Sequence, residues 1–329
     1  MTSVLVGSAD LPLTSNEVAK ITDLAKYVSA DPELDPEEFC HEAARAAVHL
    51  PNRVAEALRG FRRSGSATGV LTFSGLPVGD LPPTPEDNTR NLGMRTLLAR
   101  VQAIFNEFLG SMVAYQGEGT GLLFQDMVPA RSAARVQTSM SSAVELEVHT
   151  EQAFSDLRPD YLSLACLRGD PAATTYAITA RQLVAYFTRE EVDTLREPLW
   201  TTTIDLSFLA KSDVYASDEV RGPMPILRGA PDDPFLLLDL DLMRGVTAEA
   251  RELLKRIGAF YRAERTALTL AAGDLVFIDN LRAAHGRSEF LARFDGTDRF
   301  VIRSFAVRDL TRSRHARPGD CRRVLAVHS

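Results

Sequence analysis

Two histidines and one glutamate have the residue types and spacing of a metal site. His149 and Glu151 are separated by one residue, and His285 lies 136 positions after His149 (285 minus 149). On an extended strand, residues i and i+2 point to the same face, so His149 and Glu151 can act together. Two imidazoles and one carboxylate on one face of an iron(II) ion leave the other face open, which is the ligand set of non-haem oxygenases. A His-x-Glu pair alone is a frequent chance pattern, so this interpretation needs support from other segments.

Two arginines follow the distal histidine at a spacing that suits anion binding. Arg299 and Arg303 lie 14 and 18 positions after His285 (299 minus 285, 303 minus 285). Because they are four positions apart, an extended strand would point both side chains to the same face. Each guanidinium could bind a carboxylate through two parallel hydrogen bonds. The alternative is a solvated arginine pair on an exposed face of a sheet.

Size and composition favour one soluble domain. The chain has 329 residues, of which 45% are apolar, so it can bury a large core. A net charge of −7 argues against a nucleic-acid partner. The three cysteines are too few and too scattered for a disulfide framework, which favours a reducing, cytoplasmic location. The N-terminus lacks a signal-peptide pattern and no apolar run reaches the roughly 18 residues of a membrane span, so we expect no membrane association. The sequence does not indicate the oligomeric state.

The periodicity of apolar residues predicts helices at the front of the chain and many short strands behind them. Thr14 and Glu17 form a capping box, and prolines at positions 36 and 51 open two further helices. Additional helices are expected at 92–110 and 247–265. Runs rich in branched and aromatic residues predict strands at 70–73, 122–124, 144–148, 161–167, 174–178, 234–240, 275–278 and 300–307. The pattern predicts a mainly β fold, a β-barrel or jelly roll, with flanking helices.

We expect a single domain over residues 1–329. Residues 1–66 would form a helical N-terminal layer, residues 67–315 the β core with helical inserts, and residues 316–329 a tail. The segment 207–220 is polar and has no strong periodicity, so it is predicted to be a lid. Lys211 within it is expected to face water, because it would repel a cationic substrate.

With these residues in view, the chain resembles the clavaminate synthase-like iron(II)/2-oxoglutarate oxygenases. The resemblance is strongest to the free amino acid hydroxylases, such as those of arginine in viomycin biosynthesis and of asparagine. It covers roughly residues 60–315, and its motifs lie at 149–154, 158–161, 273–280, 285–287 and 293–299. Agreement among several independent motifs makes it specific.

The resemblance implies a fold, a metal and a cosubstrate. It implies a double-stranded β-helix, or jelly roll, in which His149, Glu151 and His285 bind Fe(II). It further implies that Arg299 binds the distal carboxylate of 2-oxoglutarate, with Thr175 as a helper. A fixed cation suits this role because 2-oxoglutarate is a dianion.

The resemblance also implies contacts to the two termini of a free amino acid. Arg303 would receive the substrate carboxylate, and Glu118 falls where the family contacts the substrate α-amine. A buried ammonium needs such an anionic acceptor to offset its desolvation. Ser139 matches a serine that lines the substrate pocket in the family. An exposed loop glutamate is the alternative for Glu118.

Two aspartates indicate a basic substrate. Asp239 and Asp241 end the apolar segment 234–241 and, being two positions apart, would share one face of a strand. Such a pair can hold a cationic side chain. The arginine hydroxylase of the family carries two aspartates at the same spacing. The alternative is a turn or a helix N-cap leading into the helix at 247.

We therefore expect an enzyme that hydroxylates a free basic L-amino acid such as arginine, lysine or ornithine. C3 is the first choice for the new hydroxyl group and C4 the second, with 2-oxoglutarate and O2 as cosubstrates. The setting implied by the resemblance is antibiotic biosynthesis. Two alternatives stay open: desaturation or oxidative cyclisation of an amino-acid-derived metabolite on the same scaffold, and a non-catalytic barrel that binds an amino acid.

Overall fold

The structure is a computed structural model that describes residues 9–205, 208, 219–319 and 321–328. Most of the predicted lid at 207–220, including Lys211, lies outside the described residues. No helix in the described part of the chain is long and apolar enough to cross a membrane.

The main sheet is built around β6 (Tyr161–Arg168), which pairs antiparallel with a strand on each side. These neighbours are β14 (Leu275–Asp279) and β16 (Phe300–Val307). The sheet continues from them in both directions. Its full order is β1 (Ala9–Pro12), β2 (Val70–Ser74), β14, β6, β16, β3 (Ser111–Tyr115) and β17 (Arg323–Val324), with β4 (Gln125–Met127) also paired to β16.

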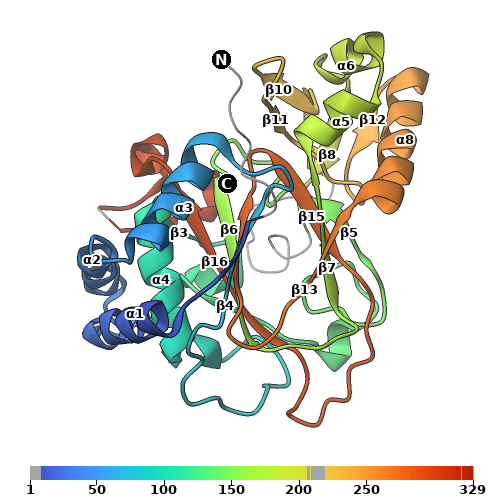
Figure 1. The fold of residues 1–329 in the computed structure, drawn as a ribbon. Coiled ribbons are helices and arrows are strands. Elements are labelled where there is room, and N and C mark those ends of the chain that lie inside the picture. Colours follow the sequence, from blue (N-terminus) through green and yellow to red (C-terminus); the bar gives the residue numbers. More distant parts are fainter. Residues whose placement is uncertain (1–8, 206–207, 209–218, 320, 329) are drawn as a thin grey trace.

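A second sheet carries the two histidines of the predicted metal site. Its order is β13 (Thr266–Thr269), β7 (Thr174–Thr179), β15 (Ala283–Arg287) and β5 (Leu146–His149), and every pairing is antiparallel. The main and second sheets face each other in Figure 1. Side chains of both sheets line one cavity.

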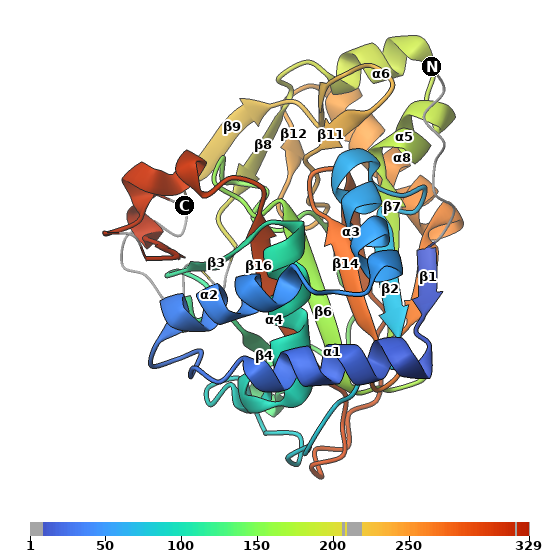
Figure 2. The same cartoon turned by 60° about the vertical axis from the view of Figure 1, so that its left-hand side comes forward.

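The helices of the N-terminal half cover the outer face of the main sheet (Figure 2). They are α1 (Ser15–Tyr27), α2 (Pro36–Ala47), α3 (Asn52–Ser64) and α4 (Leu97–Leu109). Alternation along β14 divides the apolar side chains between two layers. Phe277 packs with the helices, whereas Val276 and Ile278 belong to the cluster on the other face.

A third apolar cluster joins the second sheet to the helices and small sheets at the top of Figure 1. These helices are α5 (Ala180–Tyr186), α6 (Arg189–Leu195) and α8 (Ala248–Glu264). The small sheets are β12 (Arg244–Gly245) with β8 (Trp200–Thr203) and β9 (Val220–Met224), and β10 (Leu227–Gly229) with β11 (Pro234–Leu236). Short 3-10 helices span Leu92–Arg95, Gly119–Gly121, Arg131–Ala133, Leu310–Ala316 and Ala326–His328.

The predicted helix starts are confirmed. Thr14 caps α1 and forms the capping box with Glu17, and Pro36 is the first residue of α2. Thr247 caps α8 by accepting a hydrogen bond from the backbone N–H of Ala250.

Three predicted segments differ from the structure. The helix expected at 92–110 is interrupted by Thr96, which is extended and caps a new helix, α4. The strand expected at 122–124 begins instead at Gln125, where the chain pairs with Arg303 of β16. The strand expected at 234–240 ends at Leu236, because the pairing between β10 and β11 ends there. The sequence reading also missed the short helices α5 and α6.

Phe105 of α4 makes the contact between helices and sheet testable. Its ring lies edge-on to Phe73 at 4.9 Å and stacks on Phe277 at 6.4 Å between centroids, and all three side chains are buried. We expect Phe105→Ala to lower the free energy of unfolding by about 3–5 kcal/mol, because the change removes the ring and leaves a cavity. Urea denaturation measures this loss. Phe108→Ala, at a partly buried position one turn on, is the control and should cost clearly less. Equal losses in the free energy of unfolding for the two variants would contradict the special role of Phe105 in the contact between helices and sheet.

Candidate active site

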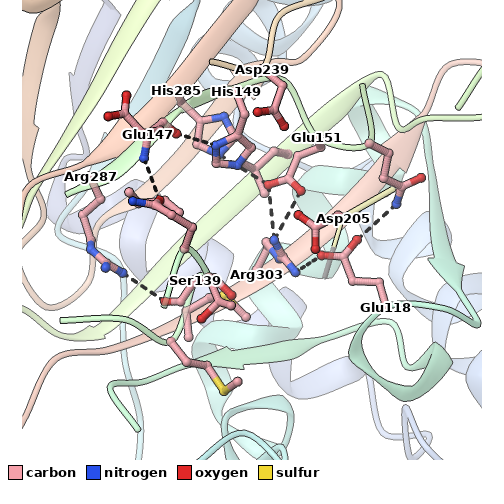
Figure 3. Close-up of a pocket in the computed structure, with 18 of the residues that line it drawn as sticks. Glu118, Ser139, Glu147, His149, Glu151, Asp205, Asp239, His285, Arg287 and Arg303 are labelled. Atoms are coloured by element: carbon pink, nitrogen blue, oxygen red, sulfur yellow. Dashed lines mark hydrogen bonds and ion pairs between the residues drawn. The ribbon is translucent and has the colours of Figure 1, made fainter. Parts of the chain in front are cut away.

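All ten residues singled out for chemistry line one cavity of about 370 Å³ between the two sheets (Figure 3). They are Glu118, Ser139, His149, Glu151, Thr175, Asp239, Asp241, His285, Arg299 and Arg303. Antiparallel pairing and loops bring them together from positions spread over more than half of the chain.

The two histidines are neighbours because of strand register. His285 of β15 lies directly opposite His149 of β5, and their ring centroids are 4.6 Å apart. Glu151 follows two residues after the end of β5, and its Oε1 lies 3.3 Å from His285 Nε2. One ligand atom from each of the three lies within 4.8 Å of the others, so they can share one ion.

Hydrogen bonds orient two of the three ligands. His149 Nδ1 lies 2.8 Å from the carbonyl oxygen of Glu147, which assigns the proton to Nδ1 and leaves Nε2 as the ligand atom. The backbone of Glu151 is hydrogen-bonded to the side chain of Asn280. The first contact fixes the imidazole ring of His149 and the second fixes the backbone of Glu151.

The charges of the three ligands suit a divalent ion. Burial alone would raise the pKa of Glu151, but Arg303 and the two imidazoles outweigh it and hold this pKa well below its usual range. Burial lowers the pKa of His285, which favours the neutral imidazole. For His149, burial is outweighed by Glu151 and Asp239, which raise its pKa. An ionised carboxylate beside imidazoles is the donor set that iron(II) takes in oxygenases, so the residues fit this metal.

Arg303 lies at the centre of a buried polar cluster (Figure 3). It forms an ion pair with Glu118, a hydrogen bond with Gln125, and contacts of 3.3 Å with both carboxylate oxygens of Glu151. Gln152 donates to the other oxygen of Glu118 at 3.1 Å. Burial raises the pKa of Glu118 to about 7 although Arg303 opposes the shift. The residues predicted to bind the two substrate termini therefore contact each other.

Arg299 presents a buried positive charge to the cavity. It lies immediately before β16, is 6% exposed, and burial lowers its pKa. Within the described part of the chain it makes no ion pair with a carboxylate. Thr175 of β7 lines the same cavity and is also buried. A buried guanidinium facing a cavity is a strong binding position for an anionic ligand.

Asp239 and Asp241 reach the cavity from a turn, not from a strand. The prediction that they share a strand face was wrong, because β11 ends at Leu236. The Oδ1 of Asp239 instead accepts hydrogen bonds from the backbone N–H groups of Asp241 and Leu242 at 2.9 and 2.8 Å. The observed turn is the alternative that the sequence predicted for these two residues. Burial raises the pKa of Asp239 to about 6 although His149 opposes the shift.

Arg287 is a functional candidate that sequence reasoning missed. It lies two residues after His285 on β15, is buried, and donates to the carbonyl oxygens of Ser139 and Ser141 at 3.0 and 2.6 Å. Burial, with the nearby Arg299, lowers the pKa of Arg287 to about 9. Arg287 thus connects the loop segment that contains Ser139 to β15, the strand that carries His285. The alternation of side chains along 285–287 was the signal that could have revealed it.

Three further polar residues of the cavity were also missed: Gln125, Gln152 and Asp205. Figure 3 shows Asp205 beside Glu118 and Arg303, and its negative charge contributes to the raised pKa of Glu118. In the sequence, none of the three stands at the spacing of a metal ligand or an ion pair, so only the tertiary structure identifies them.

Comparison with known proteins gives consistent results. The family model of the taurine catabolism dioxygenase TauD, TfdA family, matches residues 216–305. The chain is 52% identical to an L-lysine 3-hydroxylase of Catenulispora acidiphila, over 98% of this chain and 90% of the relative.

Two solved structures are similar over nearly the whole chain. Asparagine oxygenase in complex with Fe(II), 2S,3S-3-hydroxyasparagine and succinate has a TM-score of 0.89 at 33% identity, covering 96% of this chain and 99% of that one. The non-haem iron oxygenase OrfP in complex with Fe, succinate and (3S)-hydroxy-L-Arg has a TM-score of 0.84 at 28% identity, covering 96% and 100%. With the buried His149–Glu151–His285 cluster, these matches establish that the chain belongs to the clavaminate synthase-like iron(II)/2-oxoglutarate-dependent amino acid hydroxylases.

Proposed function

We propose that this enzyme hydroxylates a free basic L-amino acid, with L-lysine as the first choice and C3 as the position. The observation that carries the proposal is one cavity with a His149–Glu151–His285 cluster, a buried cation at Arg299, and several carboxylates. The relative at 52% identity is an L-lysine 3-hydroxylase, and OrfP is described with a hydroxylated arginine, which supports a basic substrate.

The proposal includes a jelly-roll core in a single oxygenase domain. Two mainly antiparallel sheets that both line the cavity, with two of the three proposed metal ligands, His149 and His285, on one of them, support a double-stranded β-helix. All three cysteines are free, which supports the cytoplasmic location expected from the sequence.

His149, Glu151 and His285 would hold the iron, which together with 2-oxoglutarate and O2 supplies the oxidising power for C–H hydroxylation. Glu151 contributes a carboxylate that Arg303 keeps ionised. The distal carboxylate of 2-oxoglutarate would bind Arg299, with Thr175 beside it. This pairing would offset the desolvation of a guanidinium that is 6% exposed.

The termini of the amino acid would bind at the Arg303–Glu118 pair. Its α-carboxylate can take the guanidinium of Arg303 and its α-ammonium the carboxylate of Glu118, so the ligand exchanges partners with an existing ion pair. Ser139, held by Arg287, would form part of the wall beside the substrate.

The side-chain cation of the substrate would lie near Asp239 and Asp241, with Asp205 as a further carboxylate of the cavity. Carboxylates at this end of the cavity favour an ammonium or guanidinium over a neutral amide. The chain would use these contacts to place one carbon of the substrate next to the iron, since orientation decides which C–H bond reacts.

The reaction itself can be tested by product mass. Iron-loaded protein incubated with 2-oxoglutarate and L-lysine is expected to form succinate in step with a product about 16 Da heavier than lysine. Arginine, ornithine and asparagine serve as comparison substrates. His149→Ala should abolish succinate formation, because it removes one metal ligand. A product about 2 Da lighter would indicate desaturation instead, and turnover by His149→Ala would refute the proposed iron site.

Arg299 can be tested through the cosubstrate. Arg299→Ala is expected to raise the KM for 2-oxoglutarate about 10- to 100-fold, as a lost charged hydrogen bond of about 1.5–3 kcal/mol requires. The KM for lysine should change little. Arg299→Lys keeps the charge but loses the second hydrogen bond. Its KM for 2-oxoglutarate should lie between those of the wild-type protein and Arg299→Ala. An unchanged KM for 2-oxoglutarate in Arg299→Ala would show that the cosubstrate binds elsewhere.

Asp241 can be tested through substrate choice. Asp241→Asn removes one negative charge at nearly constant shape, so kcat/KM for lysine is expected to fall about 10- to 100-fold. The KM for 2-oxoglutarate should not move. Asp232→Asn, the same change at an exposed loop position outside the cavity, is the matched control. Equal activity of Asp241→Asn and Asp232→Asn on lysine would remove Asp241 from the substrate site.

A further inference from the structure

The side chain of Asn280 connects two segments of the proposed iron site. Asn280 follows β14 directly and its side chain is 0% exposed. Its Oδ1 accepts a hydrogen bond from the backbone N–H of Glu151 at 2.7 Å. Its Nδ2 donates to the carbonyl oxygens of Glu151 and Pro159 at 3.2 and 2.8 Å. One amide group therefore binds both backbone polar groups of the same residue, Glu151.

This contact compensates for a lack of strand pairing at Glu151. Strand β5 ends at His149, so no ladder hydrogen bonds from β15 hold the backbone two residues later. Thr150 is held by Leu238 through its N–H at 2.7 Å, and Asn280 takes over at the next residue. The side-chain amide thus replaces the backbone partner that a longer strand would have supplied.

Asn280 is also fixed at its own backbone and lies close in sequence to the second histidine. Its N–H donates to the carbonyl oxygen of Asp160 at 3.0 Å. His285 follows five positions later (285 minus 280), within β15. The segment 280–285 therefore contains one proposed metal ligand, His285, and binds the backbone of another, Glu151.

We propose that Asn280 is a positioning residue for the metal site, which sets the carboxylate of Glu151 against the two imidazoles. The proposal rests on the proposed iron site and adds a residue that does not touch the metal. An amide is required because the position needs one acceptor and two donors at once. An aspartate would keep the acceptor, lose both donors and place a second buried carboxylate next to Glu151.

The test measures metal affinity and stability separately. Co(II) or Fe(II) is titrated anaerobically into metal-free wild-type protein, Asn280→Ala and Asn280→Asp, and the melting temperature of each metal-free protein is recorded. We expect both variants to bind metal about 10- to 100-fold more weakly, as is typical when the partner of a ligand is lost. Asn280→Asp is nearly isosteric and provides the same readout if the alanine variant fails to fold.

Asn106→Ala is the matched control for a general loss of stability. Asn106 is also an asparagine with 0% exposure, and its Nδ2 donates to Ser163 Oγ at 3.0 Å in the helix–sheet core, away from the cavity. It should lower the melting temperature without weakening metal binding. Wild-type affinity in an Asn280 variant, or an equal loss of affinity in Asn106→Ala, would overturn the positioning role.

The two proposals fail in different ways. If wild-type protein binds metal no more tightly than His149→Ala, the iron site itself is wrong. If wild-type protein binds tightly and the Asn280 variants bind as well, only the role of Asn280 is wrong.

Discussion

The register between β15 and β5 is the constraint on which the site depends. It places His285 opposite His149, although 136 positions separate them (285 minus 149), and a shift by one residue would turn one imidazole to the other face of the sheet. Glu151 lies beyond the last ladder pair and so depends on side chains for its position. The remaining polar residues of the cavity are arranged around these three, with Arg303 in contact with Glu151 and Arg287 on the same strand as His285.

Local sequence signals predicted those parts of the fold that local chemistry decides. Thr14, Pro36 and Thr247 set helix starts because capping and proline geometry act within a few residues. Strand ends were less predictable, since β11 ends and β4 begins where partner strands allow pairing. The apolar residues at 123–124 and 237–238 are buried without being strands, and burial alone cannot distinguish the two states.

Within the site, the residues with ionic or metal-binding spacing could be read from the sequence, but their mutual contacts could not. The sequence placed Arg303 and Glu118 in one site without showing that they pair with each other. The hydrogen bonds of Arg287 to Ser139 and of Asn280 to Glu151 join residues 148 and 129 positions apart, respectively. Such contacts follow from sheet topology and leave no periodic trace along the chain.

The buried pair of Arg303 and Glu118 also bears on which small molecules the cavity admits. If the amino acid binds at this pair as proposed, an anionic group that takes Arg303 from Glu118 leaves that buried carboxylate without its ion-pair partner, unless the ligand also brings a cationic group. A deaminated acid would leave Glu118 unpaired in a nearly dry environment, whereas a decarboxylated amine would leave Arg303 in contact with Glu151. In the proposed binding mode, discrimination against deaminated acids would therefore reside in the protein's own ion pair and would precede recognition of the substrate side chain.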